Sequence, residues 1–543
     1  MSATLSEPDA PPEHKPRADA GPSAADASQL VDRMPVWFRT PKQLTLHVLF
    51  LAVCFIFFSY RPLWHSDLWG HLAYGRLIAE RTSIPQSEPF MPLAEGVPLV
   101  DTAWLSQLAG YAAYSLAGET ALQFLSATGI TLCLSLLAWR FYERTQDLVT
   151  GLAALAAFLW LEWHTLVVFR PQLAGLCCFV GLFVLLSSRR ERRRDWFLVP
   201  ALMALWANLH GSFALGILLP GTLFAGRVTD VIRRTGTVRA AWNDRRAWRL
   251  LLLTQLAAVA VLANPYGIQL YAEVLTFSSN PNLSVIGEWE PLTLRSQQGV
   301  AVFAIAVAIA VLLRFSPRRV TAGDVLLLIG LGAASLWTSR FLVWWAPVAA
   351  MTLALHGHAV VRGLRRRLVE NSVKAAPPQR RSLWTVASLG MLWIGFAYTP
   401  FGMRVLHGEE PELSRVVSSQ TPIRAAEYLR KHPPAGPLFN AMEFGDYLAW
   451  SGVRTVFVTS HVHLVPREVW RHYLAILTAE SGWADLLARY GVNVVVLNPY
   501  DDNQASLLSQ LRASPAWRVD FEDERSVVFG RVKPIPPPEW TRP

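Results

Sequence analysis

A polar run near the start of the chain, from Trp64 to His71 (WHSDLWGH), carries the residues best suited to chemistry. It directly follows an apolar segment, so the carboxylate of Asp67 is expected at a membrane surface, between aromatic side chains. A carboxylate within hydrogen-bond reach of a hydroxyl group can accept its proton as that hydroxyl attacks. Ser66 and Asp67 also precede an amphipathic stretch from Leu68 to Glu80, which is the pattern of an ordinary helix N-cap. Both interpretations of Asp67 stay open, and one residue can serve both.

His71 follows Asp67 by four residues, so on a helix the two side chains share a face. That face could contact a phosphate, or hold a divalent metal if Glu88 or Asp101 supplied further ligands from the same loop. No spacing in the sequence requires a metal, and a hydrogen-bonded histidine is the commoner arrangement. No cofactor is therefore assigned, and a divalent metal remains an alternative. Asp101 also has a structural interpretation, as the N-cap of a juxtamembrane helix from Thr102 to Leu116.

The composition shows that these residues belong to a membrane protein. Hydrophobic residues make up 52% of the chain and charged residues only 17%, with 22 tryptophans. Most of the apolar runs are long enough to cross a hydrocarbon core of about 30 Å, and the shorter ones need flanking aromatic residues or a thinned bilayer. The predicted fold class is a polytopic α-helical protein with eleven transmembrane helices. They are expected near 44–60, 118–139, 148–166, 171–188, 196–209, 212–226, 250–263, 299–314, 322–338, 341–356 and 383–400.

The orientation in the membrane follows from the basic residues. The loops expected on one face carry 24 Lys and Arg residues, whereas those expected on the other carry 6. This asymmetry predicts a cytoplasmic N-terminus in the inner (plasma) membrane, and the odd number of helices then sends residues 401–543 to the far side. The net charge of +10 reflects this topology and does not indicate nucleic-acid binding. All four cysteines fall within apolar runs, so neither a disulfide nor a thiolate metal site is expected.

Because the outer face is poor in cations, its few arginines are informative. Arg170 lies beside Pro171, and Arg340 lies between the ninth and tenth helices. Charges this close to hydrocarbon are costly and usually have a partner or a function, such as stabilising the charge of a phosphate. The alternative for each is an arginine that extends to the lipid headgroups.

Two further outer segments carry polar residues. Asn208 and His210 lie in a tight turn between two helices, where polar backbone is tolerated only inside the protein or beside a wet cavity. A sugar-binding cavity and a turn capped by its own Asn and Gly are both compatible with this pattern. Glu288 and Glu290 flank Trp289 in the 264–298 loop, where carboxylates and an indole could bind a sugar. Trp289 could equally be an ordinary interfacial aromatic residue.

The rest of the chain divides into four parts. Residues 1–42 are expected to form a disordered cytoplasmic tail, and residues 43–400 the transmembrane domain, whose first outer loop spans 61–117. Residues 401–533 alternate between β-rich and helical stretches and predict a small α/β domain that binds or caps and does not catalyse. Its expected strands include Val453–Val458, Val492–Leu497 and a hairpin of Arg518–Glu522 with Ser526–Val532. Residues 534–543 form a Pro-rich end that is expected to hang free.

Nine short motifs are spread along the chain: DLWGHLAYGRLI from Asp67, IPQSEPF from Ile84, VDTAWLS from Val100, RPQ from Arg170, WANLHG from Trp206, NPYG from Asn264, EWEP from Glu288, FN from Phe439 and GDYLAW from Gly445. These motifs resemble those of the bacterial GT-C-type membrane glycosyltransferases that use polyprenyl-phosphate sugars, the protein-mannosyltransferase-like branch among them. One position departs from the pattern, because Glu88 stands where an Asp usually precedes Pro-Phe.

The resemblance implies a GT-C-like fold and an inverting sugar transfer in which Asp67 is the general base. The implied donor is a polyprenyl-phosphate sugar, and the acceptor is a glycan, a lipid or a protein on the non-cytoplasmic face. Donor or acceptor binding is expected from His71, Glu88, Asp101, Arg170, Asn208, His210, Glu288 and Arg340. A lipid-sugar transporter would share the cavity and the arginines but would have no use for a base. A ligase of preassembled glycan would depend on Arg340 and His210 more than on a carboxylate.

Overall fold

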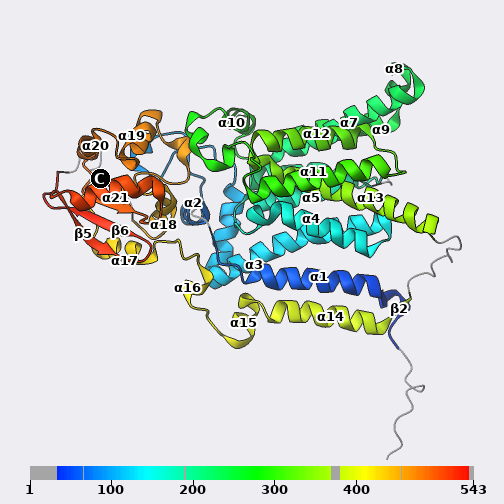
Figure 1. Ribbon diagram of the computed structural model, residues 1–543, viewed down its shortest axis with the longest axis horizontal. Coiled ribbons are helices and arrows are strands. Elements are labelled where there is room, and N and C mark those ends of the chain that lie inside the picture. The colour runs from blue at the N-terminus through cyan, green and yellow to red at the C-terminus, as the bar shows by residue number, and fades with distance from the viewer. Residues whose placement is uncertain (1–32, 65–66, 189–190, 369–378, 454, 537–543) are drawn as a thin grey trace, which may run out of the picture.

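The computed structural model describes residues 33–64, 67–188, 191–368, 379–453 and 455–536. Within these residues, each of the eleven apolar runs forms a helix, and the helices lie side by side in one bundle (Figure 1). They are α1 (Lys42–Ser59), the later part of α3 (Trp104–Thr145), α4 (Leu148–Leu166), α5 (Gln172–Leu186), α6 (Asp195–Leu209), α7 (Phe213–Thr235), α9 (Arg245–Val261), α11 (Gln297–Phe315), α12 (Ala322–Trp337), α13 (Leu342–Leu368) and α14 (Ser382–Ala397).

By length and composition alone, five of the described helices could each cross a membrane: α1, α3, α4, α7 and α11. A sixth is counted if α14 and α15 (Pro400–His407), which meet at 85°, are taken as one broken span. Helices α5, α6 and α12 are apolar but shorter, with 15 or 16 residues each. The protein is therefore a multi-pass membrane protein whose bundle mixes long and short apolar helices.

Helix α3 combines two elements that the sequence predicts separately. It begins at Trp104 rather than Thr102, with Ala103 as its N-cap, so Asp101 lies outside the helix. At Gly118 the backbone takes a positive φ of 61°, a conformation that glycine adopts readily and that bends α3 into two arms. The first arm is juxtamembrane and the second lies in the bundle (Figure 1). Two juxtamembrane helices, α2 (Asp67–Arg81) and this arm, thus follow α1, as expected.

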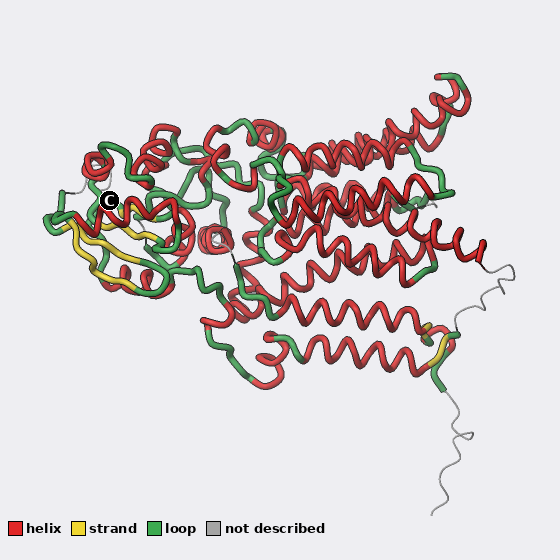
Figure 2. Tube along the Cα trace, in the orientation of Figure 1, coloured by secondary structure: helices red, strands yellow, loops and turns green. Residues whose placement is uncertain are grey.

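The C-terminal domain contains a four-stranded sheet with the order β3-β4-β6-β5. Strand β3 pairs parallel with β4, and β6 pairs antiparallel with both β4 and β5. Among the described residues, the only other strands are the short pair β1 (Thr40–Pro41) and β2 (Arg380–Arg381), which joins the starts of α1 and α14 (Figure 2). The sheet is formed by β3 (Leu438–Asn440), β4 (Val494–Leu497), β5 (Trp517–Glu522) and β6 (Val527–Arg531).

Five helices lie around this sheet, while α10 (Gln269–Phe277) and α16 (Leu413–Val416) lie between the sheet and the bundle and α8 (Val238–Trp242) lies at the opposite end of the molecule (Figure 1). The five are α17 (Ile423–Lys431), α18 (Met442–Trp450), α19 (Arg467–Leu477), α20 (Trp483–Arg489) and α21 (Ala505–Ala513). The core of the domain includes Met91 and Leu99 from the first outer loop. The domain and this loop therefore share one hydrophobic core.

Two expectations about the C-terminal domain are wrong. Among the described residues of 453–458, which exclude 454, only Val456 is paired, in an isolated bridge to Leu438, so no strand forms there, and the strand beside β4 is β3. The Pro-rich end is not free from residue 534, because Ile535 exchanges two hydrogen bonds with the side chain of Asn493. Residues 537–543 of that end, and residues 1–32 of the expected disordered tail, lie outside the described residues.

Candidate active site

Helix α2 carries Asp67 and His71, two of the candidate site residues. Asp67 is its first residue, so the carboxylate lies in the first turn, where the helix dipole favours negative charge. Ser66, the other half of the predicted cap, lies outside the described residues. The helix is held closely on two sides. A Cβ atom on Gly70 would lie 2.1 Å from Asp446 Oδ1 of α18, and one on Gly75 would lie 2.2 Å from the carbonyl oxygen of Gln107 in α3.

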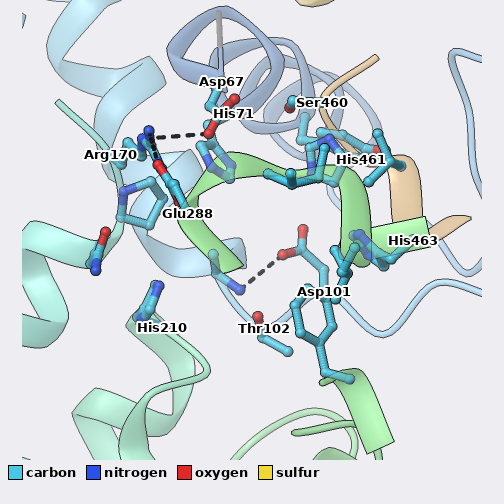
Figure 3. Close-up of a pocket in the computed structure, with 18 of the residues that line it drawn as sticks. Asp67, His71, Asp101, Thr102, Arg170, His210, Glu288, Ser460, His461 and His463 are labelled. Carbon is cyan, nitrogen blue, oxygen red and sulfur yellow. Dashed lines mark hydrogen bonds and ion pairs between the residues drawn. The ribbon is translucent and has the colours of Figure 1, made fainter. Parts of the chain in front are cut away.

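Asp67, His71 and Tyr74 of α2 face a cavity of about 560 Å³ between the bundle and the C-terminal domain. Its polar lining comes from segments that are far apart in the sequence, from Asp67 in α2 to His463 in the C-terminal domain (Figure 3). The predicted site residues that line it are Asp67, His71, Asp101, Arg170, His210, Glu288 and Arg340. The structure thus brings together seven of the nine predicted residues, from five different loops and α2.

Arg170 is the centre of the charged part of this cavity. Its Nη2 atom lies 2.5 Å from Glu288 Oε1, and its Nε atom lies 3.4 Å from Asp67 Oδ2 (Figure 3). Burial opposes the charge of Arg170, but the ion pairs with Asp67 and Glu288 outweigh it and raise the pKa of Arg170. Burial likewise opposes the charge of Glu288, yet the neighbouring Arg170 and Arg340 hold the pKa of Glu288 below its usual value. The three side chains therefore form a charged bridge across the cavity.

Arg340 is the second cation. It lies in the short turn between α12 and α13, with its guanidinium 5.1 Å from the ring centroid of Trp289. Burial lowers the pKa of Arg340, against the opposing influence of Glu288. The same turn fixes the Glu288 backbone, because Thr338 and Ser339 donate their hydroxyls to the Glu288 carbonyl at 3.0 and 3.2 Å. Arg340 is thus a half-buried cation that no carboxylate fully neutralises, which is a suitable environment for an anionic ligand.

The two predicted histidines differ in their surroundings. His210 is held at 2.7 Å by Ser212 Oγ. Burial, with the nearby Arg340 adding to it, lowers the pKa of His210 to about 3, so its imidazole is neutral at physiological pH. His71 lies 3.3 Å from Gln107 Nε2, and that amide also donates to Asp101 Oδ1 at 3.1 Å. Gln107 therefore connects the α2 residues to Asp101.

Asp101 is almost fully buried, with 6% of its surface exposed. Its Oδ1 atom accepts hydrogen bonds from the backbone N–H of Ala103 at 2.9 Å and from Gln107. The bond from Ala103 orients the turn before α3, but the predicted capping role is wrong, because the N-cap is Ala103 and no side chain caps the helix. Burial raises the pKa of Asp101 to about 6, despite these hydrogen bonds and the nearby His461. The pKa of this carboxyl group therefore lies closer to neutral pH than that of an ordinary aspartate, as suits a group that exchanges protons.

Two predicted site residues do not line the cavity. Glu88 accepts hydrogen bonds from the Tyr74 hydroxyl and from the backbone N–H groups of Phe90 and Met91, so it organises the loop instead. Asn208 accepts from Trp104 Nε1 at 2.9 Å and donates to the Ala263 carbonyl at 2.8 Å, so it joins α6 to its neighbours. Both side chains are hydrogen-bonded to other groups, and neither is among the residues that line the cavity.

The residues do not fit a metal site. Among the described residues, no three His, Cys, Asp or Glu side chains come close enough together to share an ion. Of the four candidates from the sequence, Asp67 is paired with Arg170, Glu88 is bound to Tyr74, and the fixed oxygen of Asp101 is occupied by two donors. No step of the chemistry is therefore assigned to a metal.

The C-terminal domain contributes residues that the sequence reasoning missed. Ser460, His461 and His463 line the cavity opposite Arg170 and Glu288 (Figure 3). Burial, followed by the nearby His461, lowers the pKa of His463 to about 3. Asp446 lies behind this loop and accepts from the Ser460 backbone N–H at 3.0 Å. The available signal was a pair of histidines two residues apart directly after the apolar run that ends at Val458.

Two further cavities meet the first at Arg170. One is a groove of about 530 Å³ between α2, α3, α5 and α6, lined almost entirely by apolar side chains such as Leu72, Leu132 and Leu205. Its few polar lining residues include His71, Gln107 and Arg170, which also line the main cavity. The other is a polar cavity of about 440 Å³ that shares Arg170, Glu288 and Arg340. An apolar groove inside the bundle thus opens directly onto the charged site.

Solved structures with a similar fold are found. The chain is similar to the Archaeoglobus fulgidus oligosaccharyltransferase in its apo form, with a TM-score of 0.50 and 14% identity over 86% of this chain and 70% of that one. It is also similar to ArnT from Cupriavidus metallidurans in the apo state, with a TM-score of 0.50 and 15% identity over 90% of this chain and 98% of that one. The chain has a GT-C-like fold. No protein-family model matches the sequence, and no curated protein is significantly similar to it in sequence.

Proposed function

We propose that this GT-C-like protein is a glycosyltransferase that moves a sugar from a polyprenyl-phosphate donor to a hydroxyl-bearing acceptor, with inversion. The observation that carries the proposal is the junction of an apolar groove in the bundle with a cationic cavity, at His71, Gln107 and Arg170. A lipid-linked sugar likewise combines an apolar part, its hydrocarbon tail, with two polar parts, a phosphate and a sugar ring. The fold shared with an oligosaccharyltransferase agrees with such a substrate.

The groove is assigned to the isoprenoid tail of the donor. Its walls are apolar and lie within the membrane-spanning part of the bundle, so a branched hydrocarbon chain can replace lipid there without desolvating polar groups. At its mouth, Arg170 and Arg340 supply the positive charge that a phosphate requires. Stabilising the leaving phosphate electrostatically is the largest contribution that such a site can make to the rate.

Asp67 is assigned to the proton transfer. The acceptor oxygen forms a bond to the anomeric carbon, and the bond from that carbon to the phosphate oxygen breaks, with its electron pair leaving on the phosphate. The proton of the acceptor hydroxyl passes to a carboxylate oxygen of Asp67, which lies in the same cavity as the arginines. Attack from the side opposite the departing phosphate inverts the configuration.

The site is assigned to the non-cytoplasmic side of the inner membrane. The C-terminal domain and α2 lie at one end of the bundle, while the starts of α1 and α14 lie at the other (Figure 1). The arginine-rich loops, including the one around α8, are at this second end, which the charge asymmetry makes cytoplasmic. The N-terminus is then cytoplasmic and the C-terminal domain extracytoplasmic.

The test is a transfer assay on the purified protein in lipid nanodiscs with a panel of polyprenyl-phosphate sugars. We expect at least one donor to release polyprenyl phosphate, faster when a soluble glycan, lipid or peptide acceptor is present. A protein that moves the intact donor across a vesicle membrane without breaking it would instead be a transporter. Transfer of preassembled oligosaccharides only, from a panel that includes them, would identify a ligase.

A further inference from the structure

A second group of polar atoms lies in the cavity, apart from the charged bridge. Within the described part of the chain, Asp101 Oδ2 and His461 Nδ1 are both buried and have no hydrogen-bond partner. Buried polar atoms in folded proteins are nearly always paired, because an unpaired one loses its hydration without compensation. Two such atoms in one cavity indicate that a ligand completes their hydrogen bonds.

Asp101 has the geometry of a binding carboxylate. Its Oδ1 atom is fixed by Ala103 N–H and Gln107 Nε2, so the side chain cannot rotate without breaking both bonds. Its Oδ2 atom then remains directed into the cavity (Figure 3). One oxygen holds the group in place, and the other is available to a ligand.

His461 comes from the other side of the cavity, from the C-terminal domain. Its ring centroid lies 4.8 Å from that of Tyr74, 5.7 Å from His71 and 5.8 Å from His463, so aromatic rings confine it. Asp446 fixes the loop by accepting from Ser460 N–H. Asp101 and Asp446 both interact electrostatically with His461. The imidazole is thus held in place beside two carboxyl groups.

The chemistry of this pair suits hydroxyl groups. Asp101 Oδ2 can only accept a hydrogen bond when ionised, and an imidazole can accept at one nitrogen and donate at the other. A phosphate is disfavoured here, because a carboxylate repels it, whereas Arg170 and Arg340 are available for it elsewhere in the cavity. A neutral sugar ring, with adjacent groups that both donate and accept, satisfies both atoms.

We propose that Asp101 and His461 bind the hydroxyl groups of the transferred sugar, so that the C-terminal domain supplies part of the sugar site. This rests on the proposed function. The sugar is a neutral hexose or pentose, because a uronic acid would bring a second negative charge towards Asp101. Asp446 is a positioning residue that acts through the Ser460 backbone.

The test compares the binding of two lipids. Undecaprenyl phosphate reports on the tail and phosphate alone, and undecaprenyl-phosphate glucose, galactose, mannose, arabinose and glucuronic acid add the sugar. For the wild-type protein we expect at least one neutral sugar to strengthen binding over the sugar-free lipid. Asp101→Asn and His461→Gln should weaken binding of that sugar lipid about 10- to 100-fold, the range for a lost hydrogen bond to a charged group. Binding of the sugar-free lipid should stay unchanged, which also shows that the variants are folded.

The matched control is His432→Gln, an exposed histidine of the same domain, which should change neither measurement. The inference is overturned if Asp101→Asn and His461→Gln both bind the sugar lipid as much more tightly than the sugar-free lipid as the wild-type protein does. It is also overturned if no sugar strengthens wild-type binding, or if the glucuronic acid lipid binds most tightly. Failure of the proposed function has a different result, because the wild-type protein would then bind none of these lipids, or would bind them without releasing polyprenyl phosphate in the transfer assay.

Discussion

Replacing Asp67 by Asn removes the proton acceptor with the least change of shape. Asn is also acceptable at the start of a helix, so α2 should still begin at the same place. Loss of general-base assistance lowers rates by about 10²- to 10⁴-fold, and we expect transfer to fall by that amount. The donor KM should change much less, because the arginines at the phosphate position remain.

The cost in stability can be worked from the ion pairs. Breaking a buried pair costs about 3–5 kcal/mol when it leaves one charge bare. Asp67 and Arg170 have 20% and 14% of their side chains exposed, but Arg170 keeps Glu288 at 2.5 Å. Asp67→Asn therefore leaves no unpaired buried charge. The expected loss of folding stability is closer to that of a surface ion pair, about 1 kcal/mol or less.

The assay measures initial rates in nanodiscs together with thermal unfolding followed by tryptophan fluorescence. Glu288→Gln is the matched control, because it removes the other partner of Arg170 and leaves Asp67 in place. We expect Glu288→Gln to lose less than about tenfold in rate, while costing at least as much stability, since it removes the shorter contact. A folded Asp67→Asn protein with a rate within about threefold of wild type would refute the reasoning, and so would equal rate losses in the two variants.

Three further results are expected. Arg340→Ala should weaken donor binding about 10-fold or more, whereas Arg295→Ala, an exposed outer-loop control, should have little effect, and equal mild losses would indicate that Arg340 only contacts lipid headgroups. Because the pKa of Asp101 is raised to about 6 in the folded protein, the folded state binds more protons than the unfolded state between about pH 4 and 6, and stability should fall as pH rises through this window. Asp101→Asn should make the apparent Tm fall less steeply with pH. Part of the fall should remain, because the pKa of Asp446 is also raised to about 6. An unchanged pH profile of Tm would contradict the raised pKa of Asp101. Reporter fusions should place Arg192 in the cytoplasm and Trp450 outside, and a cytoplasmic result at Trp450 would exclude the assigned orientation.

The sequence predicts the bundle well because apolar runs of membrane length have few alternative structures. The scarcity of cations on one face also predicts Arg170 and Arg340, because charges this close to hydrocarbon are costly unless they have a partner or a function. Asp67, His71 and Glu288 follow instead from the chemistry that their loops could perform and from the resemblance to GT-C-type enzymes. These residues meet in the structure although they come from distant parts of the chain.

The errors have a different origin. Glu88 and Asn208 are polar residues beside apolar helices too, but their partners are a tyrosine hydroxyl, an indole and backbone groups, which no local pattern reveals. His461 was missed because its position depends on how the C-terminal domain packs against the first outer loop, through a core shared with Met91 and Leu99. Val453–Val458 has the composition of a strand, yet β3 takes the place beside β4.

The shared lining of the cavity also affects when the protein can first act. Ribosomes make the chain from its N-terminus, so Asp67 and the arginines enter the membrane well before Ser460, His461 and His463 are synthesised. During this interval the cavity lacks one wall and its loop lacks the core that it shares with the later domain. Under the proposed function, incomplete chains stalled during insertion, and chains truncated by premature termination, should therefore be inactive, because their cavity lacks Ser460, His461 and His463.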